Sequence, residues 1–317
     1  MQVAVTGAAG RLGQVLLPAL ARDPAITRVL ALDRRPIVPP SAAASVDARE
    51  LALEDLRPAT LAGTGTLVHL AFQLMGGHGG PRRHDRDWVR EQNISLARQV
   101  FENARAAGVR HLVFLSSAAV YGPWPDSPRP LREDHPPRPR FPYAHDKVAV
   151  EEALHALGTR HPDLRVTILR PPAIVGPHAH PLLQRIARGR LYPTGPGHPV
   201  QILWEDDAAD AIVRAVTGVV PGVFNLATAP AWSLRAMARH RRRWALPVPL
   251  PLIRALHPLA WRLSAAAGDP GWVQGLDGPL ELDCSRAHTQ LGWTPRVSTP
   301  ECLERLRSTR TPTTPAP

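Results

Sequence analysis

The first 33 residues constrain the fold of this chain more than any later stretch. The run "QVAVTG" at 2–7 is short and apolar, and the following "AAGRLGQVLLPALARD" carries its leucines at helical spacing. A second apolar run, "TRVLALD" at 27–33, ends in an aspartate. Together these segments predict a strand, a glycine turn, a helix and a second strand.

The turn contains three glycines, Gly7, Gly10 and Gly13, spaced three apart. Glycine allows the chain to turn tightly and lets the backbone approach a pyrophosphate, which then lies on exposed N–H groups at a helix N-terminus. Asp33 follows Gly13 by 20 residues, at a strand end where a carboxylate can accept hydrogen bonds from ribose hydroxyls. A lone glycine triplet is usually an ordinary turn, but in this context it predicts a dinucleotide site.

Later runs continue the alternation of strands and helices. Apolar runs occupy 65–72, 110–117 and 164–170, and helical periodicity covers 91–108 and about 142–157. Strands that are almost continuously apolar are buried on both faces. The sequence therefore predicts an α/β fold, a Rossmann-like doubly wound parallel sheet with a smaller, discontinuous C-terminal substrate domain.

The pattern loosens beyond residue 176 into short segments rich in Pro, Trp and Arg. We expect a dinucleotide-binding domain over 1–169, to which 199–228 returns, a substrate-binding domain over 170–307 and a disordered tail over 308–317. The most apolar later stretch, 244–268, is interrupted by four prolines and three basic side chains. It predicts a buried or pocket-lining helix and loop rather than a membrane span.

Basic residues outnumber acidic ones, 38 against 27, which gives a formal net charge of +11. The arginines are scattered apart from the run Arg241–Arg243, so a solvated basic helix face explains them better than a nucleic-acid partner. Cys284 and Cys302 lack metal-like spacing and the histidines are isolated, so we expect no metal and a reducing, cytoplasmic location. No secretory signal is expected ahead of the first strand.

One lysine, Lys147, stands among 38 basic residues, four positions after Tyr143 in "YAHDK". On a helix these two side chains share a face, an arrangement that is usually no more than helix surface. With the Gly-x-x-Gly-x-x-Gly turn and the segments "HLAF", "SSAAVYG" and "LRPPAIVGP", however, the pair resembles the short-chain dehydrogenase/reductase superfamily. The chain length and these segments are similar to those of the superfamily's extended branch, the NAD-dependent epimerase/dehydratase family. The resemblance runs from Met1 to about Leu306.

The resemblance implies four catalytic residues. Lys147 would bind the nicotinamide ribose and lower the pKa of Tyr143, whose phenolate would exchange a proton with the substrate. The planar guanidinium of an arginine would not bond both the ribose and the phenol from one atom, which explains why this position carries a lysine rather than an arginine. Ser117 would hydrogen-bond the reacting oxygen, with Ser116 as the competing choice, and Asn93 would steady the local backbone.

The resemblance also implies a set of cofactor-binding residues. Asp47 and Ala48 would contact the adenine, Leu70 and Ala71 would line the adenosine side, and Arg170 would lie near the nicotinamide. The full set is Gly7, Ala9, Gly10, Arg11, Leu12, Gly13, Asp33, Arg34, Asp47, Ala48, Leu70, Ala71, Phe72, Tyr143, Lys147 and Arg170.

These residues predict an NAD-dependent oxidoreductase or epimerase that acts on a secondary alcohol or ketone, such as a sugar or a sugar derivative. Ala118 and Ala119 replace the acid pair of the family's dehydratases, so we do not expect their elimination of water. "RPPA" at 170–173 lacks the asparagine of many sugar-nucleotide epimerases. Asp33 favours NAD, although Arg34 and Arg35 leave NADP open.

Two alternatives stay open, an NADPH-dependent ketone reductase and a non-catalytic dinucleotide sensor. The partners expected are a small-molecule substrate and a second copy in a homodimer. We expect neither a nucleic acid nor a membrane as a partner.

Overall fold

The computed structural model describes residues 1–40, 45–76, 84–180, 183, 191–194, 197–241, 246–263 and 269–308. A sheet of seven strands, in the order β11-β6-β5-β4-β1-β2-β3, forms its centre. Every neighbouring pair in this sheet is parallel. The strands are β1 (Gln2–Thr6), β2 (Arg28–Asp33), β3 (Ser45–Glu50), β4 (Thr66–His69), β5 (His111–Leu115), β6 (Arg165–Arg170) and β11 (Gly222–Asn225).

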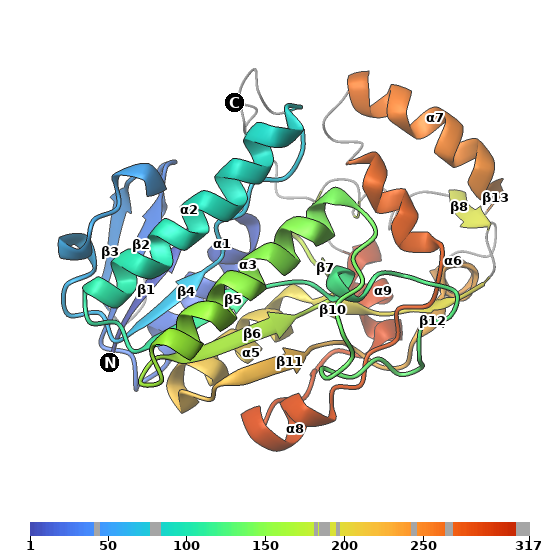
Figure 1. Ribbon diagram of the computed structural model, residues 1–317. Helices are drawn as coiled ribbons and strands as arrows, with labels where there is room; N and C mark the ends of the chain where they lie inside the picture. The colour runs from blue at the N-terminus through green and yellow to red at the C-terminus, as the bar shows by residue number, and fades with distance from the viewer. Residues whose placement is uncertain are drawn as a thin grey trace.

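Helices cover both faces of the sheet (Figure 1). α1 (Arg11–Arg22) and α5 (Glu205–Gly218) pack together on one face, and α2 (Arg86–Ala106) and α3 (Pro142–Arg160) lie on the other. Successive strand residues point to opposite faces, so Val3 and Val5 join the core under α1 and α5, whereas Ala4 joins the core under α2 and α3. The predicted doubly wound α/β sheet is confirmed.

Two boundaries differ from the expectations. β3 was not predicted as a strand, because its "SVDARE" sequence alternates charged residues on an edge strand instead of forming an apolar run. α2 begins at Arg86, five residues before the predicted start, because the Asp85 side chain caps it by accepting hydrogen bonds from the backbone N–H groups of Asp87 and Trp88.

The order of the strands places a crevice at the carboxyl end of β1. From β1 the chain continues to β2 on one side, whereas β4 pairs with β1 on the other side. Loops that follow β1, β2 and β4 therefore diverge around one point, which is where α/β sheets bind their ligands.

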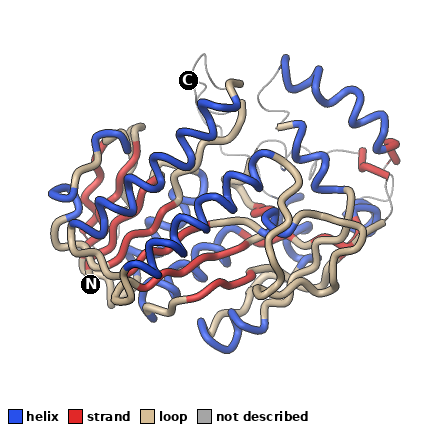
Figure 2. The backbone as a smooth tube through the Cα atoms, viewed as in Figure 1, coloured by secondary structure: helices blue, strands red, loops and turns tan. Residues whose placement is uncertain are grey.

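The segments after β6 form a lobe of short elements, apart from α5 and β11, which return to the main sheet, and α8, which packs against these two (Figure 2). The parallel pairs are β10 with β7 and β13 with β8, and β12 pairs with β9 in antiparallel fashion. The division into two domains stays a prediction. The strands are β7 (Ala173–Val175), β8 (Leu191–Thr194), β9 (Pro199–Val200), β10 (Ile202–Trp204), β12 (Trp232–Ser233) and β13 (Leu246–Pro249). The helices are α6 (Leu234–Arg241), α7 (Leu250–Leu263), α8 (Ser285–Leu291) and α9 (Thr299–Ser308).

The stretch 244–268 was expected to be buried or pocket-lining, but most residues of its described part, 246–263, are exposed. α7 exposes Leu252, Leu256, Leu259 and Leu263. None of the described helices combines the length and apolar character needed to span a lipid bilayer. Ser308, the first residue of the expected tail, ends α9, and the rest of that tail lies outside the described residues, as do Arg242 and Arg243.

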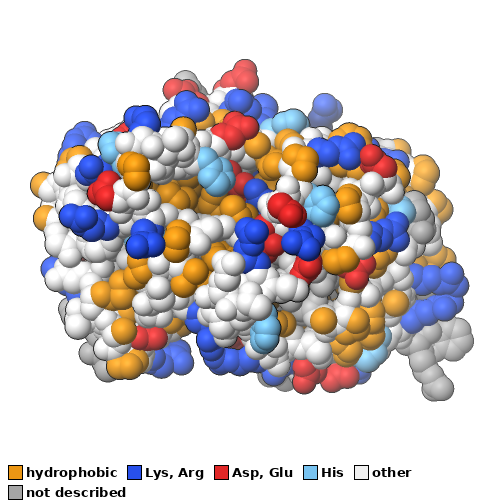
Figure 3. Space-filling model, turned by 60° about the horizontal axis from the view of Figure 1, so that its bottom comes forward, with side chains coloured by type: hydrophobic (Ala, Val, Ile, Leu, Met, Phe, Trp, Pro, Cys, Tyr) orange, Lys and Arg blue, Asp and Glu red, His pale blue; other side chains and the backbone are white. Residues whose placement is uncertain are grey.

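Basic side chains are spread over the face shown in Figure 3, between hydrophobic patches. They form no single stripe on that face. This distribution matches the scatter of arginines along the sequence.

Candidate functional site

The glycine turn packs against the loop after β4 with no room for side chains. Gly7 has φ +74°, and a Cβ there would lie 2.5 Å from the backbone N of Ala71. A Cβ at Gly10 would lie 2.8 Å from the oxygen of Gly7, and one at Gly13 would lie 2.2 Å from the oxygen of Ala8. All three positions therefore require glycine in this conformation, and the turn leads directly into the N-terminus of α1.

Asp33 at the end of β2 is tied to this turn. Its Oδ2 accepts a hydrogen bond from the backbone N–H of Ala9 at 3.0 Å, and its Oδ1 accepts from the backbone N–H and Nε of Arg35 at 3.0 and 3.3 Å. The carboxylate is 7% exposed. Arg34 reaches across to the loop after β4, where its Nη2 donates to Oε1 of Gln73 at 3.1 Å. The turn, the acid and the loop after β4 thus surround the carboxyl end of β1.

Most of the predicted cofactor-binding set lies at this edge. Leu70 accompanies Ala71 in the loop against Gly7, and the backbone N–H of Leu70 donates to the oxygen of Thr6. Arg11, in the first turn of α1, donates from Nη1 to the oxygen of Ala179 at 3.2 Å. Leu12 packs against the core under α1.

Asp47 and Ala48 do not lie at this edge. Asp47 pairs with Leu30 in the middle of β2, three positions before Asp33, and Ala48 pairs with Ala31. The Asp47 carboxylate bonds Arg28 at 2.6 Å and Arg49 at 2.7 Å, and these two arginines hold its pKa below the usual value. The structure therefore gives the Asp47 side chain an arginine pair as its partners, and its adenine contact stays a prediction.

Tyr143 stands in the first turn of α3, and its hydroxyl lies near the side chain of Ser117, two residues after the end of β5. Burial raises the pKa of Tyr143 to about 12, and the nearby side chain of Ser117 works in the opposite direction. The hydroxyl of the neighbouring Ser116 instead donates to the buried carboxylate of Glu151. Of the two competing serines, Ser117 is thus the one that the structure brings to Tyr143.

Lys147 is 4% exposed and faces two aromatic rings as well as a backbone oxygen. Its Nζ donates to the oxygen of Leu115 at 2.7 Å and lies 3.7 Å from the ring centre of Phe72 and 4.7 Å from that of Phe114. Burial lowers the pKa of Lys147 to about 7, partly opposed by Glu151 and Asp146. The ammonium is directed to Leu115 and Phe72, and the lowering of the Tyr143 pKa by Lys147 that the resemblance implies stays a prediction.

Asn93 on α2 connects the loop after β4 to α3. Its Oδ1 accepts from the backbone N–H of Gln73 at 2.7 Å, and its Nδ2 donates to the oxygen of Gln73 and to Oδ2 of Asp146, both at 3.1 Å. Asp146, which precedes Lys147, also forms a two-pronged ion pair with Arg86 at 2.6 and 2.8 Å. These contacts hold the backbone on either side of the Tyr143–Lys147 pair.

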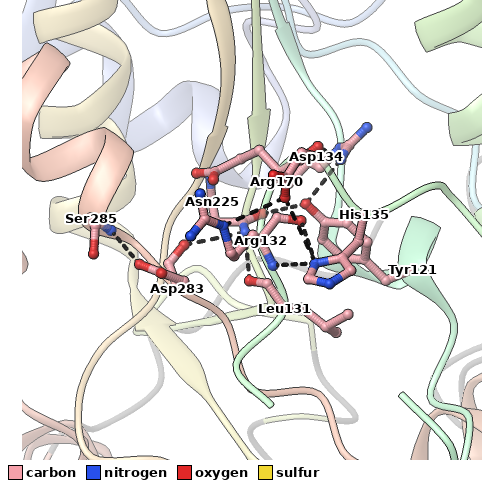
Figure 4. A network of polar contacts seen from close by, with 10 residues as sticks. Tyr121, Leu131, Arg132, Asp134, His135, Arg170, Asn225, Asp283 and Ser285 are labelled. Atoms are coloured by element: carbon pink, nitrogen blue, oxygen red, sulfur yellow. Dashed lines mark hydrogen bonds and ion pairs between the residues drawn. The ribbon is translucent and has the colours of Figure 1, made fainter. Parts of the chain in front are cut away.

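Arg170 at the end of β6 points into a buried network (Figure 4). Its Nη2 bonds Glu151 at 2.6 Å, and its Nη1 donates to the hydroxyl of Tyr121 at 2.9 Å. That hydroxyl donates in turn to Oδ1 of Asn225 at 2.8 Å, and the Nδ2 of Asn225 donates to the oxygen of Leu131. The guanidinium is therefore committed to protein partners, and a contact between Arg170 and the cofactor stays a prediction.

Sequence reasoning missed Glu151, Tyr121, Asn225, Asp146 and Arg86. Two of them had a signal, because Glu151 follows Lys147 by four residues and Asp146 precedes it directly on the same helix. Tyr121, Asn225 and Arg86 come from separate elements that only the fold brings together.

A small pocket beside Tyr143 marks where the lobe meets the sheet region. It is lined by Phe72, Gln73, Asn93, Asp146, Asp269 and Trp272, with further residues of the loop after β4 and of α2. Asp269 and Trp272 come from the C-terminal lobe, and burial raises the pKa of Asp269. In the described part of the chain, no three His, Cys, Asp or Glu side chains are grouped as metal ligands would be.

Comparisons with known proteins match this geometry. The model of the NAD dependent epimerase/dehydratase family matches residues 3–227. An uncharacterized protein of Mycobacterium tuberculosis is 31% identical over 315 residues, which cover 95% of this chain and 82% of that protein. A UDP-glucose 4-epimerase of Mycolicibacterium smegmatis is 28% identical over 324 residues, which cover 95% of this chain and 96% of the epimerase.

Solved structures share the fold over nearly the full length. MoeE5 in complex with UDP-glucose and NAD gives a TM-score of 0.72 at 26% identity, with 97% of this chain and 98% of MoeE5 covered. The UDP-glucose 4-epimerase of Thermotoga maritima gives a TM-score of 0.71 at 22% identity, with 96% and 97% covered. The likeness includes both the sheet region and the lobe.

Proposed function

This chain belongs to the NAD-dependent epimerase/dehydratase family, and we propose that it uses NAD to oxidise and reduce a secondary alcohol carbon of a sugar, with nucleotide sugars as the first candidates. The observation that carries the proposal is the placement of Tyr143 beside Ser117, with Lys147 one turn further along α3. A protein that only senses a dinucleotide has no need of a proton donor beside the site.

The relatives support the sugar class. The related enzyme of Mycolicibacterium smegmatis is named a UDP-glucose 4-epimerase, and MoeE5 is described in complexes with UDP-glucose and with UDP-glucuronic acid. The "RPPA" segment at 170–173 lacks the asparagine that many sugar-nucleotide epimerases carry. We infer that this chain holds the nucleotide portion through other residues of its lobe.

The residues around β1 fit a dinucleotide. The chain's own backbone occupies the Cβ positions of Gly7, Gly10 and Gly13, so the three glycines are what allows the tight turn that leads into the N-terminus of α1. The pyrophosphate would lie on the N-terminus of α1, and Asp33 would accept hydrogen bonds from the adenosine ribose. NAD bound there would supply the hydride acceptor and donor for the substrate carbon.

Tyr143 and Ser117 would handle the proton. With a pKa near 12, Tyr143 holds its proton at neutral pH in the free protein and is ready to donate it to the oxygen of a carbonyl undergoing reduction. Ser117 would hydrogen-bond that same oxygen and fix its position. In the opposite direction Tyr143 would accept the proton, and this needs Lys147 to turn its charge toward the phenol.

A second candidate is an NADPH-dependent ketone reductase. Arg35 touches the Asp33 carboxylate, and Arg34 lies on the same loop. Both guanidinium groups are placed to meet a 2′-phosphate, which the Asp33 charge would repel. We favour NAD because Asp33 is the group bonded to the glycine turn itself.

Turnover on a panel tests the proposal. Purified protein would be incubated with NAD and UDP-glucose, UDP-galactose or UDP-glucuronic acid, with products followed by NMR and reduced nicotinamide by absorbance. We expect conversion of at least one sugar by the wild type. Tight cofactor binding without turnover on sugars, other secondary alcohols or ketones would instead support a sensor.

A further inference from the structure

α7 carries apolar side chains on two opposite faces. Ile253, His257 and Trp261 follow one another at intervals of four and are partly buried, and the Trp261 ring lies 4.5 Å from that of His84. The opposite face carries Leu252, Leu256, Leu259 and Leu263, which we call the leucine stripe. Their exposed fractions are 49, 56, 58 and 81%. Spacings of four, three and four residues place all four leucines on one side of the helix.

The exposed large apolar side chains gather at this place. Of the six found in the described part of the chain, four form the leucine stripe and a fifth, Leu246, begins β13, which leads into α7. Single exposed apolar residues are ordinary on protein surfaces, but a continuous row marks a contact with something else. The leucine stripe is therefore the strongest candidate for a binding surface outside the catalytic site.

The charge around the leucine stripe is of one sign. Residues 231–268 contain seven arginines and neither aspartate nor glutamate. Arg235 and Arg239 are exposed on α6, and Arg262 is exposed on α7. α6 and α7 both pack against β8, so these arginines and the leucines belong to one part of the lobe (Figure 1).

Acidic side chains come near α6 and α7 from other elements. Asp277 offsets the charge of Arg254, with which it is paired, and Glu304 of α9 is paired with His240 of α6. Asp269, whose charge interacts with His257, is buried. Arg235, Arg239 and Arg262 are exposed without an ion pair in the described part of the chain, and they keep the surface around the leucine stripe positive.

We propose that the leucine stripe seats the protein on an anionic lipid bilayer, with α7 lying in the plane of the membrane surface. A helix with leucines on one side and arginines around them inserts its apolar face at the boundary between headgroups and acyl chains. The arginines would contact the anionic headgroups, as basic segments do at charged membrane surfaces. This is surface attachment, not a span, and it departs from the expectation of no membrane partner.

A second copy of the chain fits this surface less well. A two-fold contact of one leucine stripe on another would bring two arginine-rich segments without acidic residues face to face. Like charges placed together across an interface oppose association. An anionic bilayer satisfies both the leucines and the arginines.

Vesicle sedimentation tests the proposal with three proteins. These are the wild type, a double variant with Leu256→Glu and Leu259→Glu, and a control variant with Val38→Glu. Val38 is 90% exposed in the loop after β2, so its variant replaces an exposed apolar side chain by a glutamate far from α7 in sequence. We expect the wild type and the control to bind vesicles of phosphatidylcholine with phosphatidylglycerol, and the double variant to lose about tenfold or more in partitioning. Pure phosphatidylcholine vesicles or added salt should weaken wild-type binding.

Three results would overturn the proposal. These are a wild type that ignores anionic vesicles, a double variant that binds as the wild type does, and a double variant whose mass by light scattering falls in the absence of lipid. The last result would assign the leucine stripe to a second copy. Because both leucines are exposed, circular dichroism should show an unchanged fold, and Arg235→Gln with Arg239→Gln gives an independent test by reducing binding to anionic vesicles.

Discussion

The sheet region that ends at Arg170 and the lobe that follows it hold their side chains in different ways. In the sheet region Lys147, Asn93 and Glu151 are buried and each has polar partners, and the glycine turn leaves no space for a Cβ. In the lobe the strands have two to four residues, and α7 leaves a row of leucines exposed. The site residues of the sheet region thus have protein partners, whereas the lobe presents an exposed apolar row.

This difference separates the residues of the proposed catalytic site from the residues that would select the substrate or a surface. A constellation held by buried hydrogen bonds keeps its geometry whatever substrate arrives. The groups that would select a sugar or a surface lie on the less constrained lobe, where loops and short elements commonly carry specificity. The pocket lined by both Tyr143 and Trp272 is where the two regions meet.

The largest effect should come from removing the proton carrier of the sheet region. We expect Tyr143→Phe to lower kcat by about 10²–10⁴-fold, because a positioned acid or base contributes roughly that much. Tyr192→Phe makes the same change in β8 of the lobe and should leave kcat close to the wild-type value. Equal losses in the two variants, or intact turnover in Tyr143→Phe, would remove the distinction between the regions.

Breaking the buried ion pair should be the next largest effect. Glu151→Gln leaves Arg170 buried without its counter-charge, and we expect a loss of about 3–5 kcal/mol in the free energy of unfolding. The matched change in the lobe is Arg254→Gln, which removes an exposed partner of Asp277 and should cost less than about 1 kcal/mol. Urea unfolding of both variants checks this, and similar costs would contradict it.

Lys147 should make the stability of the sheet region depend on pH. Its pKa falls from 10.5 to about 7 on folding, so between these values the unfolded chain binds a proton that the folded chain does not. The free energy of unfolding should therefore rise with pH above about 7, by at most about 1.4 kcal/mol per pH unit from this group. Above about 9 the trend should reverse, since burial keeps the thiols of Cys284 and Cys302 protonated in the folded state up to about 12, and Tyr143 adds to this above about 10.

Lys147→Met should abolish the rise between pH of about 7 and 9 without moving the other transitions. Urea midpoints measured for both proteins across this range provide the comparison. A parallel pH dependence in wild type and variant would show that Lys147 is not the group responsible.

Closing the glycine turn should give the smallest loss of stability but a clear loss of binding. Gly7→Ala forces a Cβ to within 2.5 Å of the Ala71 backbone at a φ of +74°, which should cost about 1–3 kcal/mol and weaken NAD binding. Gly275→Ala in the lobe meets no atom within 4 Å and should change stability by less than about 0.5 kcal/mol. Thermal unfolding and NADH titration of both variants test this, and NADH binding by Gly7→Ala at wild-type affinity would argue against the turn as the site.

The sequence predicted those parts whose signal is local. Apolar runs predicted five strands of the sheet, and the spacing of Tyr143 and Lys147 predicted their shared helix. β3 escaped because charges alternate along an edge strand. The partners of Arg170 could not be predicted, since Tyr121 and Asn225 lie 49 and 55 positions away and meet it only through the fold.

The position of the Lys147 ammonium also depends on the fold. Neither its contact with the Leu115 oxygen nor the ring of Phe72 above it follows from spacing along the chain. The same holds for the leucine stripe, because an apolar helix is expected to be buried until the structure shows what surrounds it.

Titration with NADH and then NADPH, followed by energy transfer from the tryptophans to the bound reduced nicotinamide, tests the central claim most directly. The glycine turn and Asp33 predict binding of both nucleotides with a clear preference for NADH, and Asp33→Ala should lose that preference while the fold is kept. Failure of the wild type to bind either nucleotide, or tighter binding of NADPH, would contradict the assignment of this edge of the sheet to NAD.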